Sequence, residues 1–144
     1  MPAPVLTGLD HIVLRVCDLR RMLDFYVGVL GCTVEREQAR IGLTQLRAGA
    51  SLIDLITLDG MLGKMGGAGP GPEGRNLDHF ALGVEPFDEA ALRAHLKASG
   101  IPIIDAGERY GAQGNGPSLY IRDPEGNTVE LKGRSPESPN TASR

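Results

Sequence analysis

Apolar residues recur at every second position in two matching segments of the chain, residues 9–16 and 77–84. The first segment is Leu-Asp-His-Ile-Val-Leu-Arg-Val and the second is Leu-Asp-His-Phe-Ala-Leu-Gly-Val, so five of the eight positions are identical. A period of two indicates a strand with one face in the core. Because the two segments lie 68 positions apart, they also indicate an internal repeat.

Each of these strands is followed by a helical pattern of about three turns. The first predicted helix covers residues 19–30, where Asp18 can cap the start and Gly31 can end the helix. The second covers residues 87–99, with Pro86 at its start and Gly100 as the stop. The apolar stripe of the first helix consists of Leu19, Met22, Leu23, Tyr26 and Leu30.

Short strand patterns follow both helices, and a strong turn signal at residues 123–126 joins the last two of them. Each half therefore predicts the order β-α-β-β-β. The fold class is α+β, with two tandem modules that form half-barrel sheets around a cavity. The predicted strands are residues 33–38, 43–48 and 51–58 in the first half and 101–105, 117–122 and 127–132 in the second.

The chain of 144 residues is long enough for one domain of this kind and too short for two ordinary domains. Module one covers about residues 8–59 and module two about residues 75–133. Residues 60–74 contain seven glycines and predict a flexible connector or a lid. The tail, residues 134–144, is polar and is expected to be frayed.

Strand parity places four metal-binding side chains on the faces that point away from the helices. Ile12, Leu14 and Val16 are assigned to the helix side, which leaves His11 on the other side. The same rule applies to the other three segments that carry candidate ligands, residues 51–58, 77–84 and 127–132. The segment Ile53-Asp54-Leu55 corresponds to Val129-Glu130-Leu131 at the end of module two. The four candidate ligands are His11, Asp54, His79 and Glu130.

Two imidazoles with one or two carboxylates form a nitrogen and oxygen donor set that suits one divalent ion of Zn, Ni, Co, Mn or Fe. The alternative is that each histidine is a packed or surface residue, which is the common role of a single histidine in a strand. The repeat favours the metal site, because the same triplet opens both halves and an acid closes both.

The paired modules, with a histidine opening each and Glu130 in the last strand, resemble the vicinal oxygen chelate superfamily, which includes glyoxalase I, bleomycin resistance proteins and extradiol dioxygenases. The resemblance covers residues 8–133, and its most specific stretch is residues 119–131. It implies that His11, His79 and Glu130 are metal ligands. Asp54 falls where glyoxalase I has a glutamate ligand, so it binds directly, binds through water or does not bind.

The resemblance implies a metal-dependent lyase or isomerase of glyoxalase type, in which Glu130 or Asp54 acts as general base on a small substrate with adjacent oxygens. A metal-free, ligand-sequestering protein is the main alternative, although the chain has no Trp to build aromatic walls. An extradiol dioxygenase is disfavoured because Gln113 stands where that class has a histidine. A fosfomycin-type transferase stays open.

Three further residues share the parity of the cavity and are candidates for substrate binding: Arg15, Tyr120 and Arg122. Either arginine could hold a substrate carboxylate in a bidentate contact, or could be a strand-end residue that reaches solvent. Cys17 and Cys32 are expected to be reduced packing residues.

Composition and charge limit the partners of the chain. The net charge of −3 argues against nucleic acid, and no apolar run is long enough for a membrane span. The N-terminus lacks the features of a secretion signal, so the expected location is the cytoplasm. The expected partners are a small-molecule substrate and a second copy of the chain, which would make a homodimer.

Overall fold

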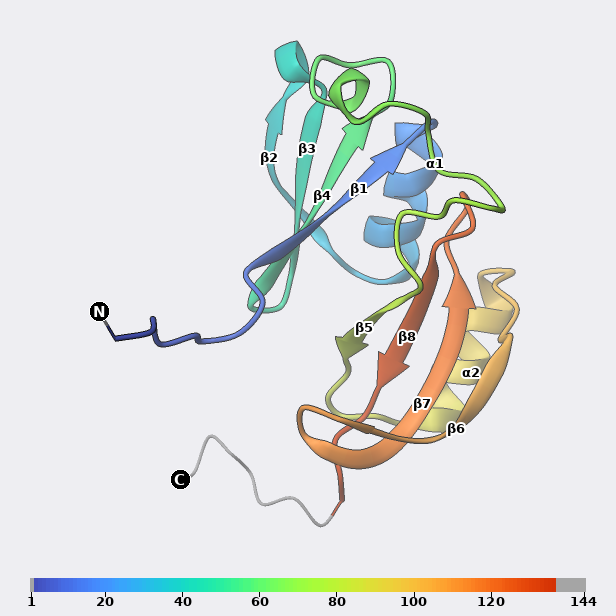
Figure 1. The fold of residues 1–144 in the computed structure, drawn as a ribbon. Coiled ribbons are helices and arrows are strands. Elements are labelled where there is room, and N and C mark those ends of the chain that lie inside the picture. Colours follow the sequence, from blue (N-terminus) through green and yellow to red (C-terminus); the bar gives the residue numbers. More distant parts are fainter. Residues whose placement is uncertain (1, 137–144) are drawn as a thin grey trace. The chain divides into compact units, whose positions relative to one another are not determined.

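The computed structural model describes residues 2–136 and divides the chain into two compact units, Met1–Gly74 and Arg75–Arg144, each of which is described by itself. Each unit contains one mixed four-stranded sheet with the same topology (Figure 1). The strand orders are β1-β4-β3-β2 and β5-β8-β7-β6, and in both sheets the first strand runs parallel to the last. The predicted α+β fold of two repeated modules is therefore confirmed.

Unit 1 contains the elements β1 (His11–Val16), α1 (Leu19–Leu23), β2 (Thr33–Gln38), β3 (Leu43–Ala48) and β4 (Ser51–Thr57). Asp18 caps α1 as expected, because its carboxylate accepts a hydrogen bond from the backbone N–H of Arg21 at 3.1 Å. The predicted single helix over residues 19–30 is wrong in its second half. A π-helix follows there (Asp24–Val29), and Gly31 then turns the chain with φ 80°.

The core of unit 1 lies between its sheet and these helical turns. Leu14, Val16, Ile53 and Leu55 are at most 1% exposed, so the parity assigned to β1 and β4 is confirmed. From the helical turns, the side chains of Met22, Phe25 and Tyr26 join this core. Cys32 is also buried, whereas Cys17 is exposed, so the expectation that both cysteines are packing residues is wrong for Cys17.

Unit 2 contains β5 (Phe80–Gly83), α2 (Glu89–Ala98), β6 (Asp105–Gly111), β7 (Gly114–Arg122) and β8 (Thr128–Lys132). Its core includes Leu96 of α2 and, from β7 and β8, Leu119, Ile121, Val129 and Leu131. Asp88 caps α2 by accepting from the N–H of Ala91, so this helix begins two residues later than predicted.

The strand predicted at residues 101–105 is wrong, because β6 begins only at Asp105. The prediction relied on the apolar residues Ile101 and Ile103, which precede the strand and are half-buried. The strand itself has a mixed polar sequence and lies at the edge of its sheet, where no alternation is required.

The glycine-rich segment 60–74 is partly ordered against unit 1. A short 3-10 helix, η3 (Gly63–Gly66), packs on the end of β4, and Gly63 is buried there. The Arg15 guanidinium donates to the backbone carbonyls of Gly63, Gly67 and Ala68 at 3.2, 2.6 and 3.0 Å. The first half of the expected flexible connector is therefore held by Arg15.

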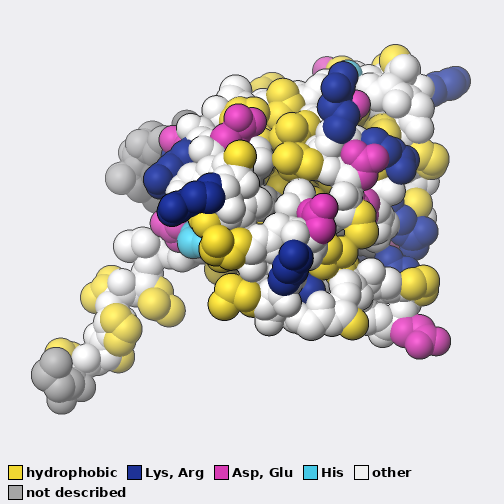
Figure 2. Space-filling view, turned by 90° about the horizontal axis from the view of Figure 1, so that it is seen from above, with side chains coloured by type: hydrophobic (Ala, Val, Ile, Leu, Met, Phe, Trp, Pro, Cys, Tyr) yellow, Lys and Arg dark blue, Asp and Glu magenta, His cyan; other side chains and the backbone are white. Residues whose placement is uncertain are grey.

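The N-terminal segment extends beyond the start of β1 (Figure 1). Hydrophobic side chains follow the N-terminal segment (Figure 2), where Val5, Leu6 and Leu9 are 84–91% exposed. Of the tail expected to be frayed, residues 137–144 lie outside the described residues. Among the described residues, no helix combines the length and the apolar character that a membrane crossing requires.

Candidate metal centre

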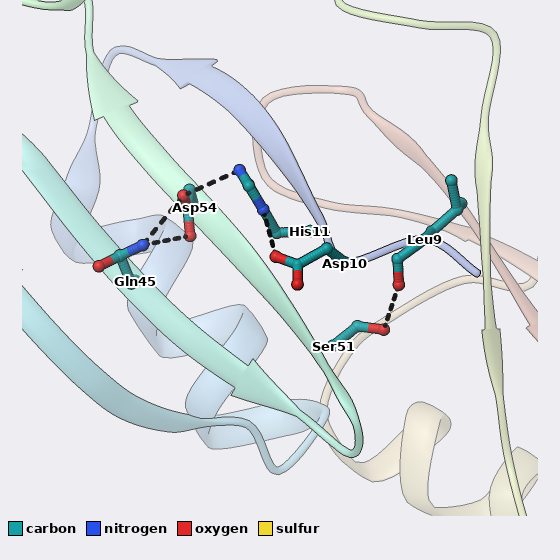
Figure 3. Close-up of polar contacts among 6 residues, drawn as sticks. All are labelled: Leu9, Asp10, His11, Gln45, Ser51 and Asp54. Carbon is teal, nitrogen blue, oxygen red and sulfur yellow. Dashed lines mark hydrogen bonds and ion pairs between the residues drawn. The ribbon is translucent and has the colours of Figure 1, made fainter. Parts of the chain in front are cut away.

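The first candidate pair lies on the sheet of unit 1, where β1 and β4 run side by side (Figure 3). His11 is the first residue of β1, and its Nε2 atom lies 3.9 Å from Oδ2 of Asp54 in β4. Asp54 is only 4% exposed. From the neighbouring strand β3, the side-chain amide of Gln45 donates to both carboxylate oxygens at 3.2 and 3.1 Å.

The other ring nitrogen of His11 is held by the residue directly before it. Nδ1 lies 2.6 Å from Oδ1 of Asp10 (Figure 3). This hydrogen bond raises the pKa of His11, the negative charge of Asp54 raises it further, and partial burial opposes both. With Nδ1 engaged by Asp10, Nε2 is the ring atom that faces the buried carboxylate and is available as a ligand.

The second candidate pair repeats this arrangement in unit 2. Nε2 of His79 lies 3.3 Å from Oε1 of Glu130, and Nδ1 lies 2.6 Å from Oδ2 of Asp78. Glu130 is 6% exposed. Its second oxygen accepts a hydrogen bond of 2.6 Å from the hydroxyl of Ser118 on the neighbouring strand β7. Each unit therefore holds one histidine against one buried, hydrogen-bonded carboxylate.

The charge balance of the two buried carboxylates fits a cation. Burying a carboxylate is unfavourable unless an opposite charge or hydrogen bonds compensate it. Among the ion pairs of residues 2–136, the partner of Asp54 is His11 and that of Glu130 is His79, and neither acid has a lysine or arginine partner. Imidazole nitrogens beside carboxylates are ligands that Zn²⁺ and related transition ions accept.

Two donors in each unit do not make a complete site. Within the part of the chain that the structure describes, no group of three or more His, Cys, Asp or Glu side chains is placed to hold a metal ion. The structure thus brings His11 together with Asp54, and His79 together with Glu130. Binding of one ion by all four residues stays a prediction.

Tyr120 lies beside the pair of unit 2. Its ring contacts the His79 imidazole edge-on, with the centroids 5.7 Å apart. Partial burial and the neighbouring Glu130 carboxylate raise the pKa of Tyr120, whereas the Arg109 guanidinium lowers it. The hydroxyl therefore stays protonated near neutral pH and can donate to an oxygen anion.

The two arginines predicted to bind substrate are placed differently. Arg122 is exposed at the end of β7. Arg15 lies on the same face of β1 as His11, but its guanidinium binds the carbonyls of the 63–68 segment. Substrate binding by either arginine stays a prediction.

Four residues that contact the candidate ligands were missed by the sequence reasoning: Asp10, Asp78, Gln45 and Ser118. The two aspartates had a signal, because the repeated Leu-Asp-His triplet places one before each histidine. Gln45 and Ser118 had none in their own sequence, since their contacts with the carboxylates depend on the pairing of β3 with β4 and of β7 with β8.

Two surface hollows lie away from these pairs. One, of about 390 Å³, lies in unit 2 beside the end of α2 and includes Arg93, Lys97 and Ile101. The other, of about 260 Å³, lies in unit 1 and includes Glu37, Thr44 and Thr57. Neither is lined by a candidate ligand.

Comparisons with known proteins agree with this architecture. The chain is 32% identical over 129 residues to virulence protein STM3117 of Salmonella typhimurium, covering 88% of this chain and 84% of that protein. The crystal structure of that protein matches with a TM-score of 0.71 at 26% identity, over 92% of this chain and 100% of that one.

An integron cassette protein from the mobile metagenome of V. cholerae matches with a TM-score of 0.70 at 28% identity, over 92% of this chain and 99% of that one. Lactoylglutathione lyase from Agrobacterium tumefaciens has a TM-score of 0.62 at 20% identity, over 89% of this chain and 94% of that one, a likeness of fold alone. The model of the Glyoxalase/Bleomycin resistance protein/Dioxygenase superfamily matches residues 8–131. This chain, with its two repeated modules, belongs to that superfamily, the vicinal oxygen chelate superfamily.

Proposed function

We propose that the chain is a metal-dependent lyase or isomerase of glyoxalase type, with one divalent ion bound by His11, His79, Glu130 and Asp54. One observation carries the proposal: both buried carboxylates face a histidine Nε2 and lack a lysine or arginine partner. A cation among them would compensate two buried negative charges, each of which faces an imidazole ring and one neutral hydrogen-bond donor.

A bound divalent ion supplies Lewis-acid stabilisation of the anion that forms on a substrate with adjacent oxygens. The protein supplies the proton transfer. Glu130 or Asp54 takes the proton from one substrate carbon and returns it to the neighbouring atom. Gln45 and Ser118 fix the carboxylate oxygens by hydrogen bonds, so that each acid presents a defined oxygen to the site.

Metal binding is the first test of this function. Purified protein is stripped with a chelator and titrated with Co²⁺ or Zn²⁺, and the bound ion is counted by elemental analysis. We expect one ion per chain, with affinity lost in His79→Ala and Glu130→Gln. His95→Ala removes an exposed histidine of α2 and is the matched control, which keeps full binding. Failure to bind any transition ion would refute the metal site and favour the ligand-sequestering function.

We further propose that the chain forms a homodimer and that the two pairs meet either within one chain or across two. Exposed Val5, Leu6 and Leu9 offer apolar area for such a contact. Light scattering after size exclusion measures the assembly. Mixing His11→Ala with His79→Ala protein separates the two arrangements: recovered metal binding after subunit exchange indicates a site shared between chains, and no recovery indicates a site within one chain.

A further inference from the structure

Arg109 lies on the same side of the second sheet as Glu130, although the sequence pattern gave no reason to select it. It belongs to the edge strand β6, whose residues Asp105, Gly107 and Arg109 pair with Tyr120, Ser118 and Gly116 of β7. Paired residues of neighbouring strands point to the same face of a sheet. Arg109 therefore shares a face with Ser118, which donates a hydrogen bond to Glu130, and with Tyr120, which is the cross-strand partner of Glu130.

The side chain of Arg109 lies flat along its own strand. Its guanidinium forms an ion pair of 3.2 Å with Asp105 and lies over the Tyr120 ring, 5.7 Å from the centroid. Gly107 makes room for this path, because a Cβ atom at that position would lie 2.4 Å from Nη1 of Arg109. An alanine at position 107 would therefore displace the Arg109 guanidinium.

The Tyr120 ring connects Arg109 with the candidate metal centre. The guanidinium carbon lies 5.7 Å from the ring centroid, and the centroid of the His79 imidazole lies 5.7 Å from the same point. The guanidinium is therefore one aromatic ring away from the histidine that would bind the ion.

The guanidinium keeps capacity for a ligand. It has five N–H donors, and it donates one hydrogen bond to Asp105 and one to the carbonyl of Glu108. The Arg109 side chain is 40% exposed and that of Asp105 is 62% exposed, so their ion pair is well hydrated and contributes little. A ligand carboxylate that makes a bidentate contact can compete with Asp105 for the cation.

We propose that Arg109 binds a second anionic group of the substrate, so that the substrate class is a small dicarboxylate with adjacent oxygens at one end. This inference rests on the proposed function, because the adjacent oxygens are the part that the metal would hold. The second carboxylate then lies one or two carbons beyond them, at the distance that Tyr120 sets. Gly107 and Tyr120 are positioning residues for this contact.

The test compares acids that differ only in the second carboxylate. Co²⁺-loaded protein is titrated calorimetrically with malate against lactate and with 2-hydroxyglutarate against 2-hydroxybutyrate, while the cobalt absorption spectrum verifies that the ion stays bound. Because a charge-assisted bidentate contact changes binding by about ten- to a hundredfold, we expect wild-type protein to prefer one diacid over its monoacid by at least about tenfold.

Three variants test which residue causes the preference for the diacid. Arg109→Gln removes it while leaving the monoacid affinity unchanged. Gly107→Ala keeps the charge but displaces the side chain, so the preference decreases. Arg93→Gln removes a comparable ion-paired arginine from α2 and is the control, which keeps the wild-type preference.

Equal affinity for diacids and monoacids in wild-type protein would overturn the inference, as would a preference that survives Arg109→Gln. Equal loss of both kinds of acid in Arg109→Gln would also overturn it, because Arg109 would then act through Glu130 and not on the ligand. Absence of Co²⁺ binding, seen before any acid is added, would overturn the proposed function together with this inference.

Discussion

Removing the Ser118 hydroxyl should destabilise unit 2 strongly for so small a change. The hydroxyl donates a 2.6 Å hydrogen bond to Oε2 of Glu130, and both residues are buried, at 2% and 6% exposure. A hydrogen bond to a charged group contributes about 1.5–3 kcal/mol to the free energy of unfolding. Removing the donor costs about that amount, because the buried carboxylate oxygen is left without this partner. Because both side chains are almost fully buried, water screens this hydrogen bond only weakly, and the full range of energies applies.

The assay is urea denaturation of chelator-treated Ser118→Ala protein at neutral pH, compared with wild type. The matched control is Ser51→Ala, whose hydroxyl donates a longer bond, 3.3 Å, to the neutral carbonyl of Leu9 at an exposed position. We expect a loss of about 1.5–3 kcal/mol for Ser118→Ala and about 0.5 kcal/mol or less for Ser51→Ala. If the two units unfold in separate transitions, only the transition of unit 2 should move.

The same variant separates a structural role of Ser118 from a role in holding the metal ligand. Loss of a hydrogen bond that orients a ligand typically lowers metal affinity by about 10- to 100-fold. A loss of stability without a loss of affinity would show that the Ser118 contact only compensates a buried charge. If Ser118→Ala changes the free energy of unfolding no more than Ser51→Ala does, the reasoning from burial and distance is refuted.

Three further predictions concern positions outside the metal pairs. A maleimide should label exposed Cys17 in the native protein and buried Cys32 only after unfolding. Burial raises the pKa of Cys32, so the stabilising contribution of its thiol is present below the usual value of 9.0 and is lost as the pH rises through the higher folded value. The free energy of unfolding of wild type relative to Cys32→Ala should therefore fall in that pH range. The hydrogen bond and charge of Arg47 lower the pKa of Glu35, so this pair stabilises the fold above the usual glutamate value of 4.5 and loses its effect as the pH falls through the folded value. The small difference in urea midpoint between wild type and Glu35→Gln should therefore disappear at low pH. Gly63→Ala places a Cβ atom 1.9 Å from a backbone oxygen, so it should cost about 1–3 kcal/mol in unfolding free energy and increase proteolysis of the 60–68 segment; unchanged proteolysis would contradict the packing of η3.

The fold could be predicted where burial imposes a period on the sequence. Strands β2 and β3 begin and end at the predicted residues, and the helix-facing residues of β1, β4 and β8 are buried as parity requires, except for Ile12, which is half-buried. Edge strand β6 follows no such period, because most of its residues are exposed on both faces, and its prediction was wrong. The π-helix was also missed, since a wider turn keeps the same apolar residues and changes only their hydrogen-bond partners.

The residues of the candidate site could likewise be predicted only where the sequence has an apolar period. Parity placed His11, Asp54, His79 and Glu130 on the faces away from the helices, because the alternate residues of these segments are apolar; in the structure His79 lies directly before β5. Arg109 escaped selection since its strand carries no apolar pattern from which a face could be assigned. Its position follows only from the pairing of β6 with β7 and from the space left by Gly107.

The proposed metal site uses donors from both modules of the repeat. Each sheet carries one histidine and one buried acid on its helix-free face, and two ligands are fewer than the three or four protein ligands of ordinary transition-metal sites. A copy of the module doubles the donor set without requiring a new fold. The acids need not have equal roles: Asp54 is held by a neutral amide donor, whereas Glu130 is held by the Ser118 hydroxyl and pairs across the sheet with Tyr120, over whose ring the Arg109 guanidinium lies. Under the proposed function, this difference assigns substrate recognition to module two and leaves module one to complete the metal coordination.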